Sequence, residues 1–180
     1  MKSLNEIYKN YQSPDYHGDK GTAHTYIDEY EKLLAPYRNG STIMEIGLYH
    51  GESLRMWEDY FTNSTIIGVD INPNTIQNLI DEGTHNIIIS DATKLEFLSH
   101  ITDHTFDVII DDGSHILEDQ INSFNLLRDK MNSGGLYIIE DIIEIDKNKD
   151  IFYTLYDNVE IIDNRHIKQR HDDVLVIFKF

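Results

Sequence analysis

The chain has 180 residues, with 32 acidic against 15 basic side chains, a net charge of −17 and no cysteine. The length suggests one domain with a sizeable core, and the negative charge argues against a partner with a phosphate backbone such as a nucleic acid. The lack of cysteine excludes disulfides, thiolate catalysis and cysteine-ligated zinc. No apolar run reaches the roughly 20 residues of a membrane span, and the first residues lack the apolar core of a signal peptide. We therefore expect a cytoplasmic protein with no membrane partner.

The N-terminal part predicts two helices joined by the polar segment SPDYHGDKGT. Ser3 and Glu6 have the spacing of a capping box before the first, short helix. The second helix ends near Pro36 and Gly40. One face of that helix carries apolar side chains at helical spacing, namely Tyr26, Ile27, Tyr30, Leu33 and Leu34.

From residue 42 onward, short apolar runs alternate with helical patterns. The candidate strands are TIMEI (42–46), TIIGVD (65–70), NIIIS (86–90), FDVII (106–110) and LYIIE (136–140). The helical patterns lie near 52–61, 74–81, 93–100 and 116–131. The apolar runs are continuous, which is typical of strands that are buried on both faces. This alternation predicts an open parallel sheet with helices on both faces.

The C-terminal end has a different pattern. Two further strands, VEIID (159–163) and DVLVIFKF (173–180), are separated only by the polar segment NRHIKQRHD. So short a connection requires antiparallel pairing. We therefore predict an α/β, Rossmann-like fold with a mostly parallel seven-stranded sheet and an antiparallel C-terminal strand. The core would span 41–180 within a single domain of residues 1–180, and the helical segment 1–40 would cover the site.

The ligands of such sheets bind outside the carboxyl ends of the strands, and polar residues gather there in this chain. In EIGLYHGES, Gly47 and Gly51 bracket the loop between the first strand and a helix. Glycine lets a backbone approach a ligand closely, and a helix N-terminus offers free N–H groups. The alternative is a tight turn with no ligand. The pattern is neither G-x-G-x-x-G nor a Walker loop, which disfavours dinucleotides and nucleoside triphosphates.

Two acids end the next strands. Asp70 in GVDINPN lies 23 residues beyond Gly47, where a carboxylate can accept both hydroxyl hydrogens of a ribose. Asp91 in SDATK could reach an adenine amino group, and either acid could instead form an Asx turn or cap a helix. Together these motifs describe an adenosine site without a pyrophosphate cradle, which suggests S-adenosylmethionine.

Acids also follow the fourth and fifth strands, in DDGSH and IIED. Asp112, Glu140 and Asp141 should converge, and no cluster of arginines accompanies them. We therefore expect a bound cation, and all-oxygen ligands suit Mg²⁺, Ca²⁺ or Mn²⁺. His115 could stand beside the cation as a general base. The alternative is that the acids form a turn and a helix cap and that His115 is a surface helix residue.

The five motifs, in this order, resemble those of class I S-adenosylmethionine-dependent methyltransferases. The resemblance is greatest to the metal-dependent sugar O-methyltransferases of macrolide biosynthesis, the mycinamicin and macrocin group, to which proteins labelled cephalosporin hydroxylase are related. It spans roughly residues 17–142 and includes the upstream segment DKGTAHTYIDEYE. Its most specific part is DDGSH followed by ED, which begins 28 residues after the second Asp of DDGSH.

The resemblance implies a divalent cation, usually Mg²⁺, held by Asp112, Glu140 and Asp141, and it implies that His115 is the general base. Asp111 remains an alternative to Asp112 as the ligand. The positions that would serve the cofactor are Glu45, Gly47, Gly51, Ser53, Asp70, Asp91 and Asp111. Some relatives have an additional N-terminal domain that this chain lacks, so we expect a smaller or more open acceptor site.

We therefore predict an S-adenosylmethionine-dependent, Mg²⁺-assisted O-methyltransferase that acts on a hydroxyl of a sugar or glycosylated small metabolite. One alternative is a lyase or cyclase that uses S-adenosylmethionine on the same fold. Another is a non-catalytic adenosine-binding or assembly protein in which the acids are only caps. The sequence leaves open whether the protein forms a homo-oligomer.

Overall fold

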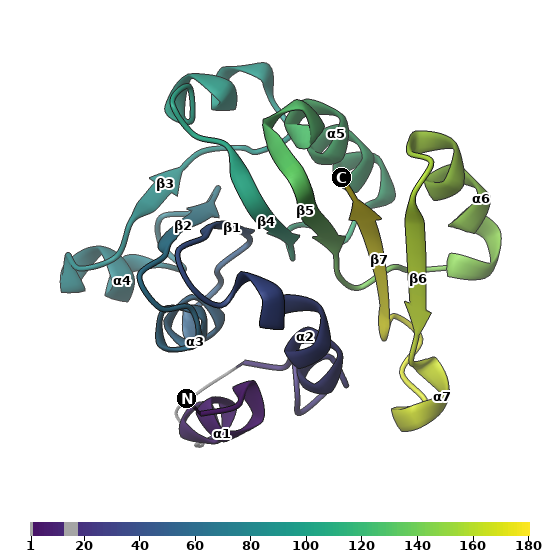
Figure 1. The fold of residues 1–180 in the computed structure, drawn as a ribbon, viewed down its shortest axis with the longest axis horizontal. Helices are drawn as coiled ribbons and strands as arrows, with labels where there is room; N and C mark the ends of the chain where they lie inside the picture. Colours follow the sequence, from purple (N-terminus) through teal and green to yellow (C-terminus); the bar gives the residue numbers. More distant parts are fainter. Residues whose placement is uncertain (1, 13–17) are drawn as a thin grey trace.

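The computed structural model of the chain describes residues 2–12 and 18–180. Its centre is a seven-stranded sheet in the order β3-β2-β1-β4-β5-β7-β6 (Figure 1). The strands are β1 (Thr42–Ile46), β2 (Thr65–Asp70), β3 (Ile87–Ile89), β4 (Phe106–Asp111), β5 (Met131–Ile139), β6 (Val159–Asp163) and β7 (Val174–Lys179). The α-helices are α1 (Leu4–Tyr8), α2 (Ile27–Leu34), α3 (Glu52–Tyr60), α4 (Gln77–Glu82), α5 (Leu117–Leu127), α6 (Ile145–Leu155) and α7 (Arg165–Lys168).

The pairing of the strands confirms the predicted Rossmann-like sheet. Strands β1 to β5 pair in parallel, whereas β7 runs antiparallel to both of its neighbours, β5 and β6. The reversal follows from the short β6–β7 connection, which cannot make a parallel crossover. That connection was predicted to be a loop, but the structure places the short helix α7 within it.

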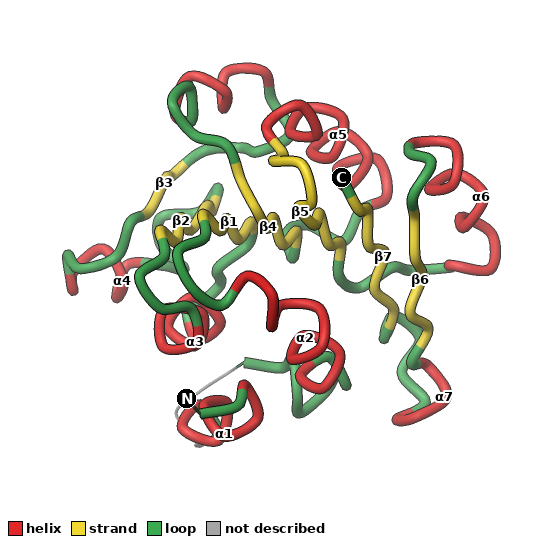
Figure 2. The backbone as a smooth tube through the Cα atoms, viewed as in Figure 1, coloured by secondary structure: helices red, strands yellow, loops and turns green. Residues whose placement is uncertain are grey.

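The sheet is covered on both faces, as expected for strands with continuous apolar runs. Figure 2 shows α1, α2 and α3 on one side of the sheet and α5 on the other. Neighbouring residues of a strand alternate between the faces: Ile43 packs in the cluster that holds Trp57 of α3, and Met44 in the one that holds Phe124 of α5. This alternation decides toward which face each acid at a strand end points.

The helices differ from the prediction in three places. The pattern near 93–100 is a 3₁₀ helix over Leu95–His100, and α5 ends at Leu127, followed by a 3₁₀ helix over Arg128–Lys130 that leads to β5. Helix α6 was not predicted, since among its residues only Ile145 and Phe152 are buried and the apolar stripe is correspondingly weak. The capping box of Ser3 and Glu6 at α1 is confirmed, and residues 13–17 of the predicted polar segment SPDYHGDKGT lie outside the described residues. Among the described residues, every helix is too short or too polar to cross a membrane.

Candidate active site at the carboxyl ends of the strands

Two adjoining cavities lie at the carboxyl ends of the parallel strands. The first measures about 270 Å³ and the second about 360 Å³. Gly47, Asp70 and Gly113 line both of them. The first extends to Asp91 beyond β3, whereas the second extends to His115 and to the N-terminal segment at residues 18–20. The strand edge that the sequence indicated is therefore hollowed.

Gly47 and Gly51 are required by the fold itself. Both have positive φ, +85° and +84°, which side chains rarely adopt. A Cβ atom on Gly47 would lie 2.0 Å from the carbonyl oxygen of Asp112, and one on Gly51 would lie 2.5 Å from the Leu79 side chain. The tight-turn explanation is thus sufficient for both glycines. Gly47 in addition lines both cavities, so its small size keeps the β1 loop against the β4 loop beside the site.

Asp70 is held by the loop that it faces. Its Oδ2 accepts hydrogen bonds from the backbone N–H groups of Leu48 at 2.9 Å and Tyr49 at 3.2 Å. Its Oδ1 accepts from the N–H of Asn72 at 2.8 Å, which is the Asx turn foreseen as the alternative role. These bonds fix the carboxylate at the boundary of the two cavities, where Oδ1 retains a free lone pair.

Asp91 also forms a local turn. It accepts hydrogen bonds from the backbone N–H of Thr93 at 2.9 Å and from the Thr93 hydroxyl at 2.7 Å. Burial raises the pKa of Asp91, but these hydrogen bonds lower it more in sum, so the pKa lies below its usual range. The side chain lines the first cavity as a carboxylate.

Glu45 and Ser53 belong to the wall on the α3 side. Glu45 is fully buried, and it accepts hydrogen bonds from the Ser53 hydroxyl at 3.0 Å and from Trp57 Nε1 at 2.9 Å. Burial raises the pKa of Glu45 to about 7. Ser53 lines the second cavity and Glu45 lines neither, so the structure places Glu45 behind the surface that a cofactor would touch.

Asp111 and Asp112 point toward opposite faces of the sheet, as the alternation along β4 dictates. Asp111 lies on the α5 side, where it accepts hydrogen bonds from the hydroxyls of Ser123 and Tyr137. Burial raises the pKa of Asp111 to about 6. Asp112 points to the other side, toward His115 and the N-terminal segment. The two acids, which the sequence left as alternatives, therefore lie on opposite faces of the sheet.

Asp112, His115 and Asp141 come together at the second cavity. Each offers one ligand atom, and these atoms all lie within 4.8 Å of one another. His115 Nε2 is 4.0 Å from Asp112 Oδ1, and His115 Nδ1 is 3.8 Å from Asp141 Oδ2. His115 Nδ1 is buried without a hydrogen-bond partner. His115 has φ +57° and precedes α5, so it is not a helix residue as the alternative interpretation supposed.

Glu140, the third predicted ligand, lies deeper. It is buried, and its Oε1 accepts hydrogen bonds from Lys20 Nζ at 2.6 Å and from the Tyr30 hydroxyl at 2.6 Å. Burial and the neighbouring Asp112 raise the pKa of Glu140 well above its usual range. Glu140 is therefore not among the atoms that already converge on one point with Asp112 and Asp141.

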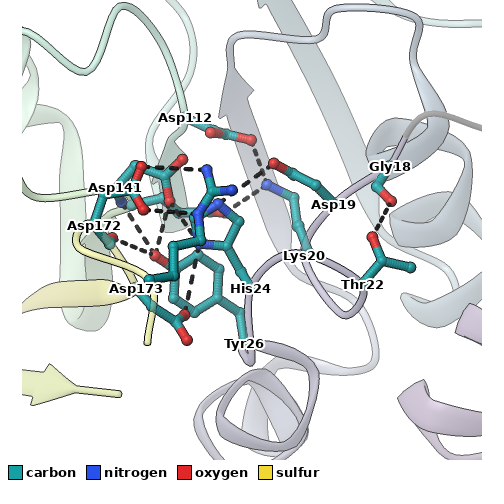
Figure 3. Close-up of polar contacts among 12 residues, drawn as sticks. Gly18, Asp19, Lys20, Thr22, His24, Tyr26, Asp112, Asp141, Asp172 and Asp173 are labelled. Carbon is teal, nitrogen blue, oxygen red and sulfur yellow. Dashed lines mark hydrogen bonds and ion pairs between the residues drawn. The ribbon is translucent and has the colours of Figure 1, made fainter. Parts of the chain in front are cut away.

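Lys20 was not recognised in the sequence, yet its ammonium group lies within the acidic cluster. Lys20 is 3% exposed, and its Nζ is 2.5 Å from Asp112 Oδ2, 2.6 Å from Glu140 Oε1 and 3.7 Å from Glu45 Oε1. Figure 3 shows it reaching toward Asp112 from the N-terminal segment. Burial alone would lower the pKa of Lys20, but the carboxylates raise it well above its usual value. The acids therefore converge around the ammonium group of a lysine, which the sequence analysis did not consider.

A second histidine stands behind Asp141. His24 is 1% exposed, with Nδ1 3.3 Å from Asp141 Oδ1 and Nε2 3.4 Å from Asp19 Oδ2 (Figure 3). Burial would lower the pKa of His24, but Asp19 and Asp141 raise it. Tyr26 donates a hydrogen bond of 2.8 Å to the same Asp141 oxygen and accepts one from the backbone N–H of Val174 at 3.1 Å.

The missed residues all come from one stretch, DKGTAHTYIDEY. Its tyrosines fitted an apolar helix face, and nothing local distinguishes Lys20 from a solvent-exposed lysine. The usable signal is indirect. Strand alternation places Glu45, Asp112 and Glu140 on the α2 face of the sheet, and such a cluster requires a positive charge from an element on that face.

A Rossmann-like sheet of this topology, with its glycine loop and adjoining cavities, defines the class I methyltransferase fold. A S-adenosylmethionine-dependent methyltransferase from Archaeoglobus fulgidus superposes with a TM-score of 0.65 over 99% of this chain and 100% of that one, at 18% identity. At that identity the likeness shows the fold alone. The family described as "Methyltransferase domain" matches residues 44–142, and the chain belongs to this family.

The relatives with higher identity are named O-methyltransferases. The chain is 36% identical over 137 residues to 8-demethyl-8-alpha-L-rhamnosyl tetracenomycin-C 2'-O-methyltransferase of Streptomyces olivaceus. The matched region covers 70% of this chain and 35% of that protein. It is 34% identical over 149 residues to mycinamicin VI 2''-O-methyltransferase of Micromonospora griseorubida, covering 77% of this chain and 36% of that protein. The chain thus spans about a third of the length of the curated relatives it matches.

One solved structure within this group is the MycE methyltransferase of the mycinamycin pathway, in complex with Mg and SAH. It superposes with a TM-score of 0.64 at 34% identity, over 78% of this chain and 37% of that one. A further structure of MycE, which also holds mycinamycin VI, superposes with a TM-score of 0.73 at 26% identity over 99% of this chain and 54% of that one. The resemblance noted in the sequence is confirmed by these relatives.

Proposed function

We propose that the chain is an S-adenosylmethionine-dependent O-methyltransferase that uses a divalent cation, Mg²⁺ in the first instance, and acts on a hydroxyl of a sugar or glycosylated small metabolite. The observation that carries the proposal is the convergence of Asp112, His115 and Asp141 at a cavity that adjoins a second, glycine-lined one. Family membership and the sugar O-methyltransferases among the relatives support the same activity.

The residues of the first cavity fit the adenosyl part of the cofactor. Asp70 stands at the junction of the two cavities with an acceptor lone pair free for ribose hydroxyls, and Asp91 offers a carboxylate to an amino group. Gly113 lines both cavities, so the passage between them is bordered by backbone rather than by a bulky side chain. The sulfonium end would then lie toward the second cavity and His115.

The residues of the second cavity fit a hard divalent cation. Asp112 and Asp141 provide carboxylate oxygens, and Glu140 lies deeper as the third proposed ligand. His115 stands beside them, with Nδ1 3.8 Å from Asp141 Oδ2 and without a hydrogen-bond partner. Burial and the neighbouring Asp112 raise the pKa of Asp141. Mg²⁺ and Mn²⁺ prefer oxygen-rich sets of this kind.

In the proposed reaction, S-adenosylmethionine supplies an activated methyl group, and the cation supplies a Lewis acid that lowers the pKa of the acceptor hydroxyl. His115 takes the hydroxyl proton. Its buried Nδ1 faces Asp141, so Nε2 is the ring nitrogen available to the cavity. Asp70 and the β1 loop hold S-adenosylmethionine. The chain contributes chiefly the alignment of the reacting groups.

We also propose that residues 1–180 work as one cytoplasmic domain in which the segment 1–40 covers the site. The contacts of Lys20 with Asp112 and of Tyr30 with Glu140 support the covering role. The net charge of −17 disfavours nucleic-acid substrates.

The test is an acceptor screen with methyl-labelled S-adenosylmethionine, with and without Mg²⁺, over free and glycosylated sugars. The expected result is a labelled methyl ether and one equivalent of S-adenosylhomocysteine, both dependent on the cation. Methylthioadenosine as the product would identify a lyase or cyclase instead. Tight cofactor binding without turnover on any acceptor in the panel would favour a non-catalytic binding protein.

A further inference from the structure

Lys20 occupies the place where a cation is needed. Its ammonium group bridges Asp112 Oδ2 at 2.5 Å and Glu140 Oε1 at 2.6 Å, which are oxygens of two of the three predicted metal ligands. Lys20 is 3% exposed, so no water shell screens these contacts. The carboxylates that would bind a divalent cation are therefore already partly neutralised by the chain itself.

The geometry leaves only part of the ligand set free for a metal ion. Asp112 and Asp141 lie with His115 within 4.8 Å, but Glu140 is not in this group because its Oε1 faces Lys20 and Tyr30. A cation that binds Glu140 must either displace the ammonium group of Lys20 or lie directly beside it. Two positive charges in direct proximity repel each other strongly in a buried site.

We propose that Lys20 is a resident counter-cation that competes with the divalent cation for Asp112 and Glu140. The proposal rests on the metal site of the proposed function. On cation binding, the ammonium leaves these two acids and remains buried beside Glu45, whose Oε1 is already 3.7 Å away. Lys20 thereby keeps the acidic cluster compact before the divalent cation binds. It also sets the affinity of the site for that cation.

The chain offers a matched control in Lys168. Its Nζ donates hydrogen bonds to the carbonyl oxygens of Gly21, Thr22 and His24 at 3.0, 2.7 and 2.7 Å. Lys168 thus holds the same N-terminal segment from the outside, and among the described residues it forms no ion pair with a carboxylate. Removing Lys168 loosens the segment without removing the competing charge.

The experiment is calorimetric titration of Mg²⁺ and, separately, Mn²⁺ into the wild type, Lys20→Met and Lys168→Met. If Lys20 competes, Lys20→Met binds both ions at least about tenfold more tightly. The repulsion between two unit charges about 4 Å apart near a protein surface exceeds the free energy that corresponds to a tenfold change in affinity. The factor should be similar for the two ions, because it comes from charge. Lys168→Met should bind them as the wild type does.

Unchanged or weaker binding by Lys20→Met overturns the proposal, and so does an equal change in Lys168→Met, which would mean that Lys20 only attaches the segment. If Lys20→Met does not fold, Lys20→Gln replaces it, because the amide is neutral but still donates hydrogen bonds to the two acids. If neither the wild type nor the variants bind a cation, the metal is removed from the proposed function as a whole. If the wild type binds the cation and Lys20→Met binds it with the same affinity, only the role of Lys20 is overturned.

Discussion

The carboxyl ends of β2 and β3 differ from those of β4 and β5 in how their acids are held. Asp70 and Asp91 accept hydrogen bonds from backbone groups at most 22 residues away. Asp112 and Glu140 are held by Lys20, which lies 92 and 120 residues away in the chain. On the cofactor side the turn that ends the strand also orients its acid, whereas on the cation side the orientation depends on tertiary packing.

The difference suggests a division of roles. Acids fixed by their own turns stay in place whether or not the N-terminal segment is docked, so the cofactor side is preformed. The cation side is completed only when α2 and the segment before it pack against the sheet and bring Lys20, Tyr26 and Tyr30 to the acids. Changes on one side should therefore leave the other nearly intact, and each prediction below examines that separation.

The largest effect is expected from loss of the cation. Chelation should abolish methyl transfer and Mg²⁺ should restore it, while the affinity for S-adenosylmethionine changes little, because backbone N–H groups of the β1 loop hold Asp70, and Asp91 lines only the first cavity. Asp112→Asn should reproduce the loss together with a loss of cation binding, whereas Asp111→Asn should keep cation binding, since Asp111 bonds to Ser123 and Tyr137 on the other face.

Activity assays and metal titrations of this pair of variants decide the assignment. Full turnover after exhaustive chelation would remove the cation from the mechanism. Loss of cation binding in Asp111→Asn but not in Asp112→Asn would show that the ligand lies on the opposite face of the sheet from the one the structure indicates.

The next effect concerns His115, the proposed general base. Its removal should lower kcat by roughly 10²- to 10⁴-fold, the usual contribution of a positioned base. His115→Asn is the better variant, because φ at this residue is +57° and asparagine tolerates that conformation more readily than alanine. Affinity for S-adenosylmethionine should stay close to that of the wild type.

The measurement is kcat together with cofactor affinity, for the wild type and for His115→Asn. A variant with a wild-type kcat would leave activation of the hydroxyl to the cation alone, and His115 would then serve only as a neighbour of the site.

A smaller effect is expected on the cofactor side. Asp70→Ala should weaken S-adenosylmethionine binding by about 1–3 kcal/mol, the range for hydrogen bonds to a charged group. Because Asp70 also accepts the N–H groups of Leu48 and Tyr49, Asp70→Asn provides the control that keeps one acceptor oxygen for the loop. Calorimetry that shows unchanged cofactor affinity in folded Asp70→Ala would reject the ribose role, and altered Mg²⁺ affinity would break the separation of the two sides.

The same contrast explains what the sequence could and could not predict. The strands and the positions of Asp70, Asp91 and Asp112 were predictable, because continuous apolar runs followed by turn residues are local patterns. The choice between Asp111 and Asp112 required the alternation of β4 against two known faces. Lys20 and His24 were not predictable, since their roles depend on contacts with residues about a hundred positions away. Helix α6 was missed because its packing face is too narrow to produce a clear period.

The smallest predicted effect concerns His85, which precedes β3 and joins charges from two helices away from both cavities. Its Nδ1 is 2.9 Å from Glu58 of α3 and its Nε2 is 2.7 Å from Glu82 of α4, while the side chain is only 6% exposed. Burial would lower the pKa of His85, but the two glutamates raise it above its usual value. A raised pKa in the folded state means that the stabilisation is complete below the unfolded pKa of about 6.5 and is lost as the pH rises through the folded value.

His85→Gln, which cannot be charged, should therefore unfold more easily than the wild type by about 1 kcal/mol near pH 6, the scale of a partly exposed ion pair. The gap should narrow when the pH is raised to about 8.5. Urea denaturation at both pH values measures it, with His100→Gln as the control, because His100 is exposed at the end of the Leu95–His100 turn. A gap of the same size at both pH values would mean that His85 contributes packing rather than charge.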